Sequence, residues 1–186
     1  MAHDPMSLPA DLPLPVNDGA ADHLAGSVVP SVPLQATDGS VVDLSGLPGR
    51  GVLFAYPRTG VPGEDPLVAD WDEIPGARGC TPEVCSFRDL HSDIAATGSR
   101  VLGLSTQDPE YQAEAATRLR LAYPLLSDAD LRLTTALRLP TFEAGGQVLL
   151  KRLTMVIDDG RISHVWYPVF PPDRHALDVL GWLRGC

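Results

Sequence analysis

The sequence is poor in cysteine, in lysine and in long apolar runs, and each shortage excludes a class of protein. Three cysteines in 186 residues are too few for the disulfide framework of a small secreted domain. No run of about 18 apolar residues occurs, so no membrane span is expected. The N-terminus has no basic segment followed by an apolar one, so no secretory signal is expected. We therefore expect a cytoplasmic protein whose cysteines are catalytic or sensing.

Positive charge is also scarce, because the formal net charge is −10 and Lys151 is the only lysine among 14 basic residues. Such a surface repels phosphate backbones and argues against nucleic acid as a partner. The length suits a single domain, either as a monomer or as a homodimer. Residues 1–27 are rich in proline, aspartate and alanine. They are expected to form a flexible arm, or irregular chain along the surface, ahead of a domain over 28–186.

The most informative stretch is GCTPEVCSFRD, residues 79–89, where a loop is expected to become a helix. Thr81 is a good N-cap, and Pro82 fits the first helical position. Glu83 adds a carboxylate to the positive end of the helix. Cys80 then lies beside unpaired backbone N–H groups, which stabilise a thiolate. This setting predicts thiol redox chemistry at Cys80.

Strands and helices are expected to alternate along the rest of the chain. Apolar runs and turn residues predict strands over 28–34, 41–44, 51–56, 100–105, 123–126, 149–157 and 162–167. Helical spacing predicts helices over 82–97, 109–121, 128–139 and 173–183. This order predicts an α/β protein with a mixed central sheet flanked by helices on both faces, as in the thioredoxin-like fold. A proline- and glycine-rich loop over 58–79 is long enough to suggest a function.

Five ordered motifs resemble those of a known family. They are Tyr56-Pro57-Arg58, Gly79-Cys80-Thr81 with Cys85 and Phe87-Arg88-Asp89, Gly103-Leu104-Ser105-Thr106, Leu125-Leu126-Ser127-Asp128 and Arg152-Leu153-Thr154-Met155-Val156-Ile157-Asp158. Over about residues 28–184 the chain resembles a peroxiredoxin of the Q type, also called bacterioferritin comigratory protein. Cysteines five residues apart would alone be a weak motif, but five motifs in family order are specific.

The resemblance implies a role for each matching residue. Cys80 corresponds to the peroxidatic cysteine, which attacks a hydroperoxide and becomes a sulfenic acid. Cys85 corresponds to the resolving cysteine, which condenses with it to a disulfide. Arg152 corresponds to the arginine that holds the thiolate and polarises the peroxide. Pro57 corresponds to the proline that shields the thiolate. The implied substrates are hydrogen peroxide and organic hydroperoxides, the implied reductant is thioredoxin-like, and no cofactor is implied.

One part of the family pattern, Pro-x-x-x-Thr-x-x-Cys, is not kept. Here 22 residues separate the proline from the cysteine, where the pattern has six. The threonine position falls on Ala77 when counted back from the cysteine and on Val61 when counted forward from the proline. Thr59 lies nearby and is a candidate for the missing hydroxyl. With Pro57 and Thr81 it completes the expected substrate-binding residues.

The spacing of the two cysteines predicts a conformational change. In a regular helix, Cα atoms five residues apart are roughly 8–9 Å from each other. A disulfide needs less than about 7 Å. We therefore expect the helix start to unwind when Cys80 and Cys85 form a disulfide.

Other interpretations of these residues remain open. One alternative is a thiol–disulfide oxidoreductase, but that class favours a Cys-x-x-Cys spacing, and the spacing here is wider. The missing threonine favours another alternative, a redox-sensing or partner-docking protein of the same fold with weak peroxidase turnover. Cys85 can be a core residue, Cys186 a surface thiol or an intermolecular resolver, and Trp71 a lid or an anchor for its loop. His91 suggests zinc, but no fourth ligand is in view, so no metal is expected.

Overall fold

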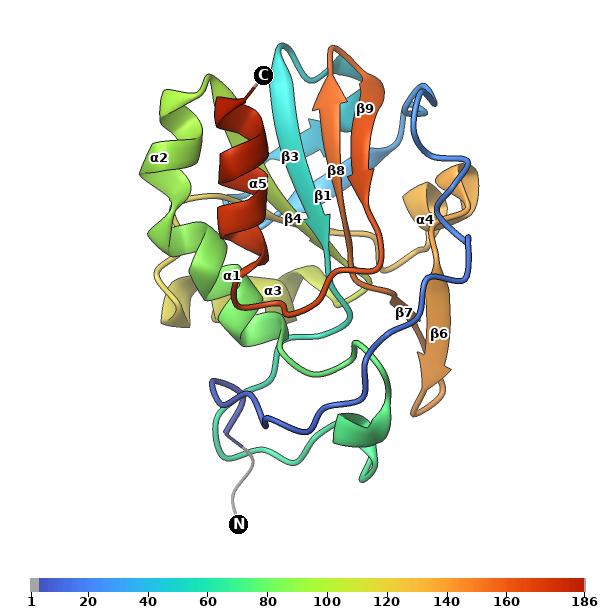
Figure 1. The fold of residues 1–186 in the computed structure, drawn as a ribbon, viewed down its shortest axis with the longest axis vertical. Coiled ribbons are helices and arrows are strands. Elements are labelled where there is room, and N and C mark those ends of the chain that lie inside the picture. Colours follow the sequence, from blue (N-terminus) through green and yellow to red (C-terminus); the bar gives the residue numbers. More distant parts are fainter. Residues whose placement is uncertain (1–3, 186) are drawn as a thin grey trace.

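A mixed seven-stranded sheet organises the molecule (Figure 1), whose computed structural model describes residues 4–185. The strand order is β2-β1-β5-β4-β3-β8-β9, with β3, β4 and β5 parallel to one another and the other pairings antiparallel. The strands are β1 (Pro33–Ala36), β2 (Val41–Asp43), β3 (Arg50–Ala55), β4 (Ser99–Ser105), β5 (Leu125–Ser127), β8 (Leu153–Asp158) and β9 (Arg161–Trp166). The mixed sheet flanked by helices is the architecture that the sequence predicts.

The helices cover both faces of this sheet. They are α1 (Cys80–Asp89), α2 (His91–Ala96), α3 (Pro109–Arg118), α4 (Arg132–Leu137) and α5 (His175–Arg184), with 3-10 turns η1 (Leu44–Gly46) and η2 (Trp71–Glu73). In Figure 1, α1, α2, α3 and α5 gather on one side, and α4 lies on the other. Among the described residues, no helix is long and apolar enough to cross a membrane.

Alternating side chains of β3 supply both halves of the core, because successive residues of a strand point to opposite faces. Phe54 and Tyr56 pack with α1, α2 and α5. The Phe54 ring stacks on Phe87 of α1, with ring centroids 4.3 Å apart. This contact fixes α1 against the central strand, and the start of α1 therefore lies at the C-terminal end of β3.

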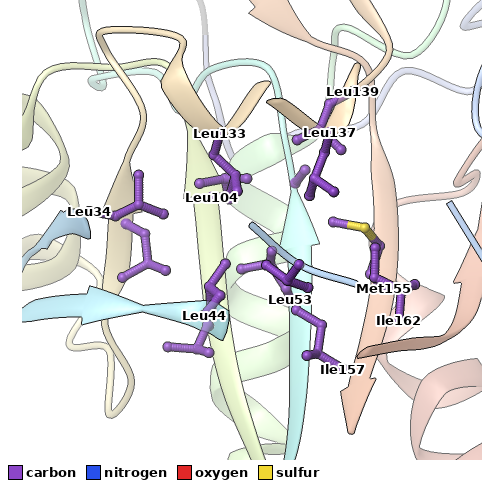
Figure 2. Close-up of a cluster of buried hydrophobic side chains, with 14 of the residues drawn as sticks. Leu34, Leu44, Leu53, Leu104, Leu133, Leu137, Leu139, Met155, Ile157 and Ile162 are labelled. Atoms are coloured by element: carbon purple, nitrogen blue, oxygen red, sulfur yellow. The ribbon is translucent and has the colours of Figure 1, made fainter. Parts of the chain in front are cut away.

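The second half of the core lies on the opposite face of the sheet (Figure 2). Leu53 packs there with Leu133 and Leu137 of α4 and with Met155 of β8. Residues 4–27 precede the sheet, and the buried side chains of their last part belong to this cluster: Ala21 and Leu24. The division of the chain at residue 28 stays a prediction.

The helix predicted over 82–97 is wrong in two respects. It is broken at Leu90 (φ −100°, ψ 4°), so that α1 packs on α5 while α2 packs on β4. It also begins earlier, at Cys80, and its N-cap is Gly79 rather than Thr81. Gly79 has φ +103°, and a Cβ there would lie 2.4 Å from Pro172 Cγ. Only glycine accommodates both this backbone angle and this close approach.

A second, two-stranded sheet formed by β6 (Thr141–Ala144) and β7 (Gln147–Leu150) is absent from the prediction. Gly145 and Gly146 join its strands, both with positive φ. A Gly-Gly pair between two short strands is a recognised hairpin signal, so the sequence did contain it. The hairpin matters because the 58–79 loop packs against it. Trp71 lies in a small apolar cluster with Ala144 and Leu149.

Candidate active site

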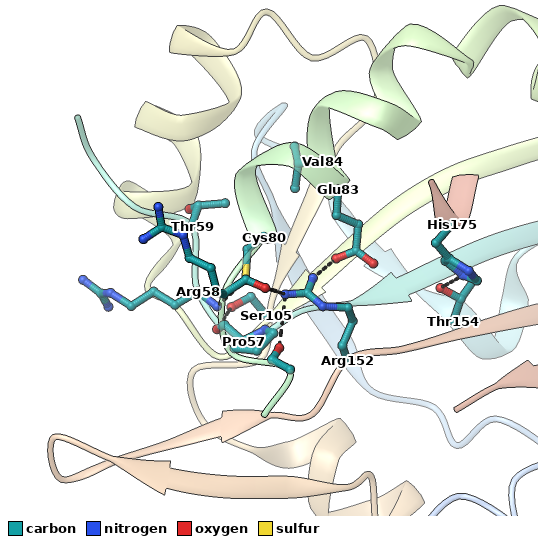
Figure 3. A network of polar contacts seen from close by, with 12 residues as sticks. Pro57, Arg58, Thr59, Cys80, Glu83, Val84, Ser105, Arg152, Thr154 and His175 are labelled. Carbon is teal, nitrogen blue, oxygen red and sulfur yellow. Dashed lines mark hydrogen bonds and ion pairs between the residues drawn. The ribbon is translucent and has the colours of Figure 1, made fainter. Parts of the chain in front are cut away.

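Cys80 is the first residue of α1, and three polar groups surround its sulfur (Figure 3). The backbone N–H of Arg58 donates to Sγ at 3.3 Å, and so does Nη2 of Arg152. The thiol lies 3.4 Å from the carbonyl oxygen of Ala77, to which it donates when protonated. Two donors and one acceptor therefore give the sulfur partners in both protonation states.

Arg152 connects the loop before β8 to the start of α1. Its Nη2 donates to the carbonyl oxygens of Gly76 at 3.3 Å, Ala77 at 3.5 Å and Arg78 at 3.1 Å. Its Nη1 forms an ion pair with Glu83. The two side chains of this pair are 2% and 0% exposed, so water does not screen their charges. The guanidinium is thereby fixed against Cys80.

Burial and charge act in opposite directions on the acids of this site. Burial raises the pKa of the Cys80 thiol, while the Arg152 charge and the Arg58 N–H oppose that shift and the Glu83 charge adds to it. Burial likewise raises the pKa of Glu83 to about 7, against the effect of Arg152. The pKa of Cys80 is thus shifted upward, opposite in direction to the expectation drawn from the helix start alone.

His175 lies on the side of Arg152 that is away from Cys80 (Figure 3). Its Nε2 is 2.8 Å from the hydroxyl oxygen of Thr154. Burial, with a contribution from the Arg152 charge, lowers the pKa of His175 to about 4. At neutral pH the imidazole is therefore uncharged, and Arg152 is the cation that faces Cys80.

The three predicted substrate-binding residues occupy different environments. The carbonyl of Pro57 accepts a hydrogen bond from Ser105 at 3.0 Å. The Thr59 hydroxyl is fully buried and donates to Gln107 at 3.2 Å. Thr81 is 1% exposed, and its hydroxyl has no hydrogen-bond partner among the described residues. Of the two threonines, only Thr81 has an unused hydroxyl, so it is the better candidate for contacting a substrate.

A small cavity opens onto Cys80. Its volume is about 70 Å³, and its walls include Pro5, Arg58, Trp71, Thr81 and Tyr111. Cys80 itself is 3% exposed. The Arg58 guanidinium stacks over the Tyr111 ring at 4.4 Å and forms part of the wall. Any molecule that reaches the sulfur must fit this cavity or displace one of its walls.

Cys85 lies one and a half turns further along α1 and faces the apolar core. It is buried, and both cysteines are free thiols. Burial raises the pKa of Cys85. The Arg88 charge lowers this pKa, and the Asp89 charge raises it. The structure therefore places Cys85 on the same helix as Cys80 without bringing the two sulfurs into a bond. Cys186, the third cysteine, lies outside the described residues.

Two residues of the site have contacts that the sequence does not predict. The sequence places Glu83 at the positive end of the helix dipole, and the structure shows its carboxylate paired with Arg152. Its position three residues after Cys80 places both on one face of the helix, which was the available signal. Arg78 was not singled out, yet it is 7% exposed and bonds to the N-terminal residues. No group of three metal-ligating side chains occurs within residues 4–185.

Comparison with known proteins agrees with this fold. Residues 24–180 match the family model described as Redoxin, which places the chain in that class of proteins. The chain is 31% identical to "Peroxiredoxin Q, chloroplastic" of Gentiana triflora, covering 96% of this chain and 77% of the relative. It is 30% identical to "Peroxiredoxin Bcp" of Escherichia coli K12, covering 86% of this chain and 95% of the relative.

A solved structure gives the same result. "Peroxidoxin BcpB" from Mycobacterium tuberculosis superposes with a TM-score of 0.69 at 32% identity, covering 87% of this chain and 96% of that one. The chain therefore belongs to the peroxiredoxin family, in the branch of the Q and Bcp proteins. Peroxiredoxins are thiol peroxidases, so the chain is an enzyme of this kind. The family resemblance and the thioredoxin-like fold predicted from the sequence are confirmed.

Proposed function

We propose that Cys80 is the peroxidatic cysteine of an enzyme that reduces hydrogen peroxide and organic hydroperoxides. The observation that carries this proposal is the contact of the Cys80 sulfur with both Arg152 Nη2 and the Arg58 N–H, each at 3.3 Å. These donors stabilise a thiolate, and Arg152 also lies where negative charge develops on a peroxide oxygen. Within residues 4–185, no such donor contacts the sulfur of Cys85.

The first step is nucleophilic attack of the Cys80 thiolate on a peroxide oxygen. An S–O bond forms and the O–O bond breaks, so the sulfur is oxidised to a sulfenic acid and the peroxide is reduced. The electron pair of the broken bond leaves with the second oxygen, which takes up a proton and departs as water or an alcohol. The unpartnered Thr81 hydroxyl supplies a hydrogen bond that holds the peroxide, in place of the family threonine.

The second step forms a disulfide between Cys80 and Cys85. The Cys85 thiol attacks the sulfenic sulfur and releases water, and a nearby thiol thus protects Cys80 from further oxidation. Both residues lie in the uninterrupted helix α1, five positions apart. Their Cα atoms are thus roughly 8–9 Å from each other, too far for a disulfide. The first turns of α1 must unwind for this step, which increased amide hydrogen exchange of residues 81–85 after oxidation would detect.

A thioredoxin-like donor then regenerates the two thiols by exchange, and is itself oxidised to a disulfide. This requirement favours a reducing compartment such as the cytoplasm. The test is peroxide-dependent oxidation of NADPH in the presence of thioredoxin and thioredoxin reductase. Turnover that is lost in Cys80→Ser supports the cycle. Turnover that persists in Cys80→Ser would contradict it.

A redox-sensing or partner-docking role is the second candidate, and the raised pKa of the enclosed Cys80 favours it. A sensor would be oxidised once and then hold its disulfide while bound to a partner. The same assay separates the two functions. A single equivalent of peroxide consumed per chain, without continued turnover at saturating thioredoxin, would favour the sensor.

A further inference from the structure

Two segments close the cavity above Cys80, and we call them the lid: residues 4–15 and residues 58–79. Residues 4–15 lie outside the part of the chain that matches the family model, which begins at residue 24. Residues 58–79 fill the enlarged gap between Pro57 and Cys80. Both contribute walls to the cavity, including Pro5 from the first segment and Leu67 and Trp71 from the second.

Arg78 fastens the two segments of the lid to each other. Its Nη2 donates to the carbonyl oxygens of Asp4 at 2.6 Å and Ser7 at 2.9 Å, and its Nε donates to Ser7 at 3.2 Å. Its Nη1 forms an ion pair with Asp72 at 3.1 Å. Arg78 itself is 7% exposed, although the side chain of its ion-pair partner Asp72 is 46% exposed. Arg78 thus ties residues 4–8 directly over the start of α1.

Close packing also holds residues 4–15 against the second segment. A Cβ at Gly60 would lie 3.1 Å from Pro5 Cβ, and one at Gly79 would lie 2.9 Å from Leu8 Cδ2. Gly76 approaches Pro15 in the same way, at 3.5 Å. At these three positions the first segment therefore lies at van der Waals distance from the second.

The second segment is supported from behind by the β6–β7 hairpin. Trp71 is 5% exposed, and its ring lies 6.3 Å from that of Phe142 in β6. Leu67 and Ile74 pack against the same apolar cluster. A wall with its own apolar core resists displacement more than an unsupported loop does. Trp71 is therefore both an anchor of its loop and a wall of the cavity.

Cys80 is 3% exposed, so the space beside its sulfur limits the size of molecule that can reach it. The cavity has a volume of about 70 Å³, and roughly 10–15 Å³ of such volume is needed to hold one water molecule. Hydrogen peroxide, with two oxygen atoms, fits. An aromatic ring or a lipid chain does not. We propose that the lid restricts Cys80 to hydrogen peroxide and short alkyl hydroperoxides, and that Arg78 and Pro5 set this limit. The inference rests on the proposed function and narrows its substrate class.

The kinetic test is single-turnover oxidation of the reduced protein by hydrogen peroxide and by cumene hydroperoxide, followed by quenching and mass spectrometry of Cys80. For the unsubstituted protein, cumene hydroperoxide should react at least about tenfold more slowly, comparable to the discrimination a pocket achieves against an extra methylene. Arg78→Met should raise the ratio of the cumene rate to the hydrogen peroxide rate by a similar factor. Arg100→Met, an exposed arginine of β4, is the matched control and should leave the ratio unchanged.

Pro5→Gly provides a second variant that leaves the bonds of Arg78 in place. It should also raise the ratio, whereas Met6→Ala, at a 49% exposed neighbour, should not. Equal rates of the two peroxides in the unsubstituted protein would overturn the inference. An unchanged ratio in both Arg78→Met and Pro5→Gly would also overturn it.

A measurement independent of peroxide chemistry separates failure of the lid from failure of the proposed function. In a Cys85→Ser, Cys186→Ser background, Cys80 is the only thiol and can be alkylated by iodoacetamide or by pyrenyl maleimide. Arg78→Met should accelerate the reaction with the large reagent relative to the small one. If no peroxide oxidises Cys80 but this relative acceleration occurs, the proposed function fails and the lid stands. If the relative rates do not change, the lid fails.

Discussion

The two cysteines of α1 share a helix and a degree of burial but differ in their polar surroundings. Cys80 is 3% exposed and Cys85 is 5% exposed, and burial raises the pKa of both thiols. Both side chains belong to the apolar cluster around Phe87, but Arg152 and the Arg58 N–H also donate to the sulfur of Cys80. Burial alone therefore does not distinguish a nucleophile from a core cysteine. The hydrogen-bond donors that contact the sulfur of Cys80 distinguish it from Cys85.

The largest expected effect is that of Cys80→Ser. A serine hydroxyl is not ionised near neutral pH and does not attack a peroxide, so reduction of peroxide should disappear. Stopped-flow measurement of peroxide consumption by the reduced protein checks this prediction. Consumption that continues in Cys80→Ser and stops in Cys85→Ser would reverse the comparison between the two residues.

Removing the cation that contacts Cys80 should have the next largest effect. Arg152→Met should slow oxidation of Cys80 by roughly 10²–10³-fold, which is typical of losing one donor to developing charge. Lys151→Met is the matched control, since Lys151 pairs with Asp18 at the surface and should not affect the rate. A slowing of equal size in both variants would contradict the role given to Arg152.

Arg152→Met also leaves Glu83 buried without its partner, which costs about 3–5 kcal/mol of unfolding free energy when a buried pair is broken. The double variant Arg152→Met, Glu83→Gln removes that charge. It should regain stability in thermal unfolding while its oxidation of Cys80 stays slow. Recovery of the rate together with stability would show that the single variant was slow merely because it was unstable.

A smaller effect is expected from Glu83→Gln, measured as the pH dependence of Cys80 oxidation. The Glu83 charge raises the pKa of Cys80, so its removal should lower that pKa and move the rise of the rate to lower pH. In the unsubstituted protein Glu83 ionises at a pKa of about 7, and above that pH its charge opposes formation of the thiolate. Glu114→Gln, which removes an exposed carboxylate paired with Arg118, should not move the profile. A shift to higher pH in Glu83→Gln would contradict this account.

The smallest effect on the first step is expected from Cys85→Ser. Cys85 does not contact the Cys80 sulfur, so the rate of oxidation by the first equivalent of peroxide should stay the same. The product should differ, because a sulfenic acid without a resolving thiol proceeds to sulfinic acid under excess peroxide. Intact-mass measurement follows both products. Equal resistance to over-oxidation in both proteins would assign resolution to another thiol, such as Cys186.

The sequence was sufficient for the sheet, for its flanking helices and for the start of the cysteine-bearing helix within two residues. Local patterns carry that information, since a buried strand such as β3 is a continuous apolar run. The cap was misplaced because Thr81 fits an N-cap by type. Contacts of Gly79 with Pro172 and Leu8, distant in sequence, decided the position instead.

The candidate site was only partly predictable. Motifs identified Cys80 and Arg152, but the pKa of Cys80 depends on its burial in the folded chain, which spacing cannot give. The bonds of Arg78 to residues 4 and 7 join positions more than 70 residues apart in sequence, and no local pattern predicts such a contact. Tertiary packing therefore supplied the walls of the site, while sequence motifs supplied its reacting groups.

The most direct test of the contrast between the two cysteines adds one equivalent of hydrogen peroxide to the fully reduced protein and maps its thiols by non-reducing peptide mass spectrometry. The account predicts a disulfide between Cys80 and Cys85, and its absence in Cys80→Ser. An unmodified Cys80, with the oxidation found on another residue, would contradict the assignment of Cys80 as the residue that attacks peroxide.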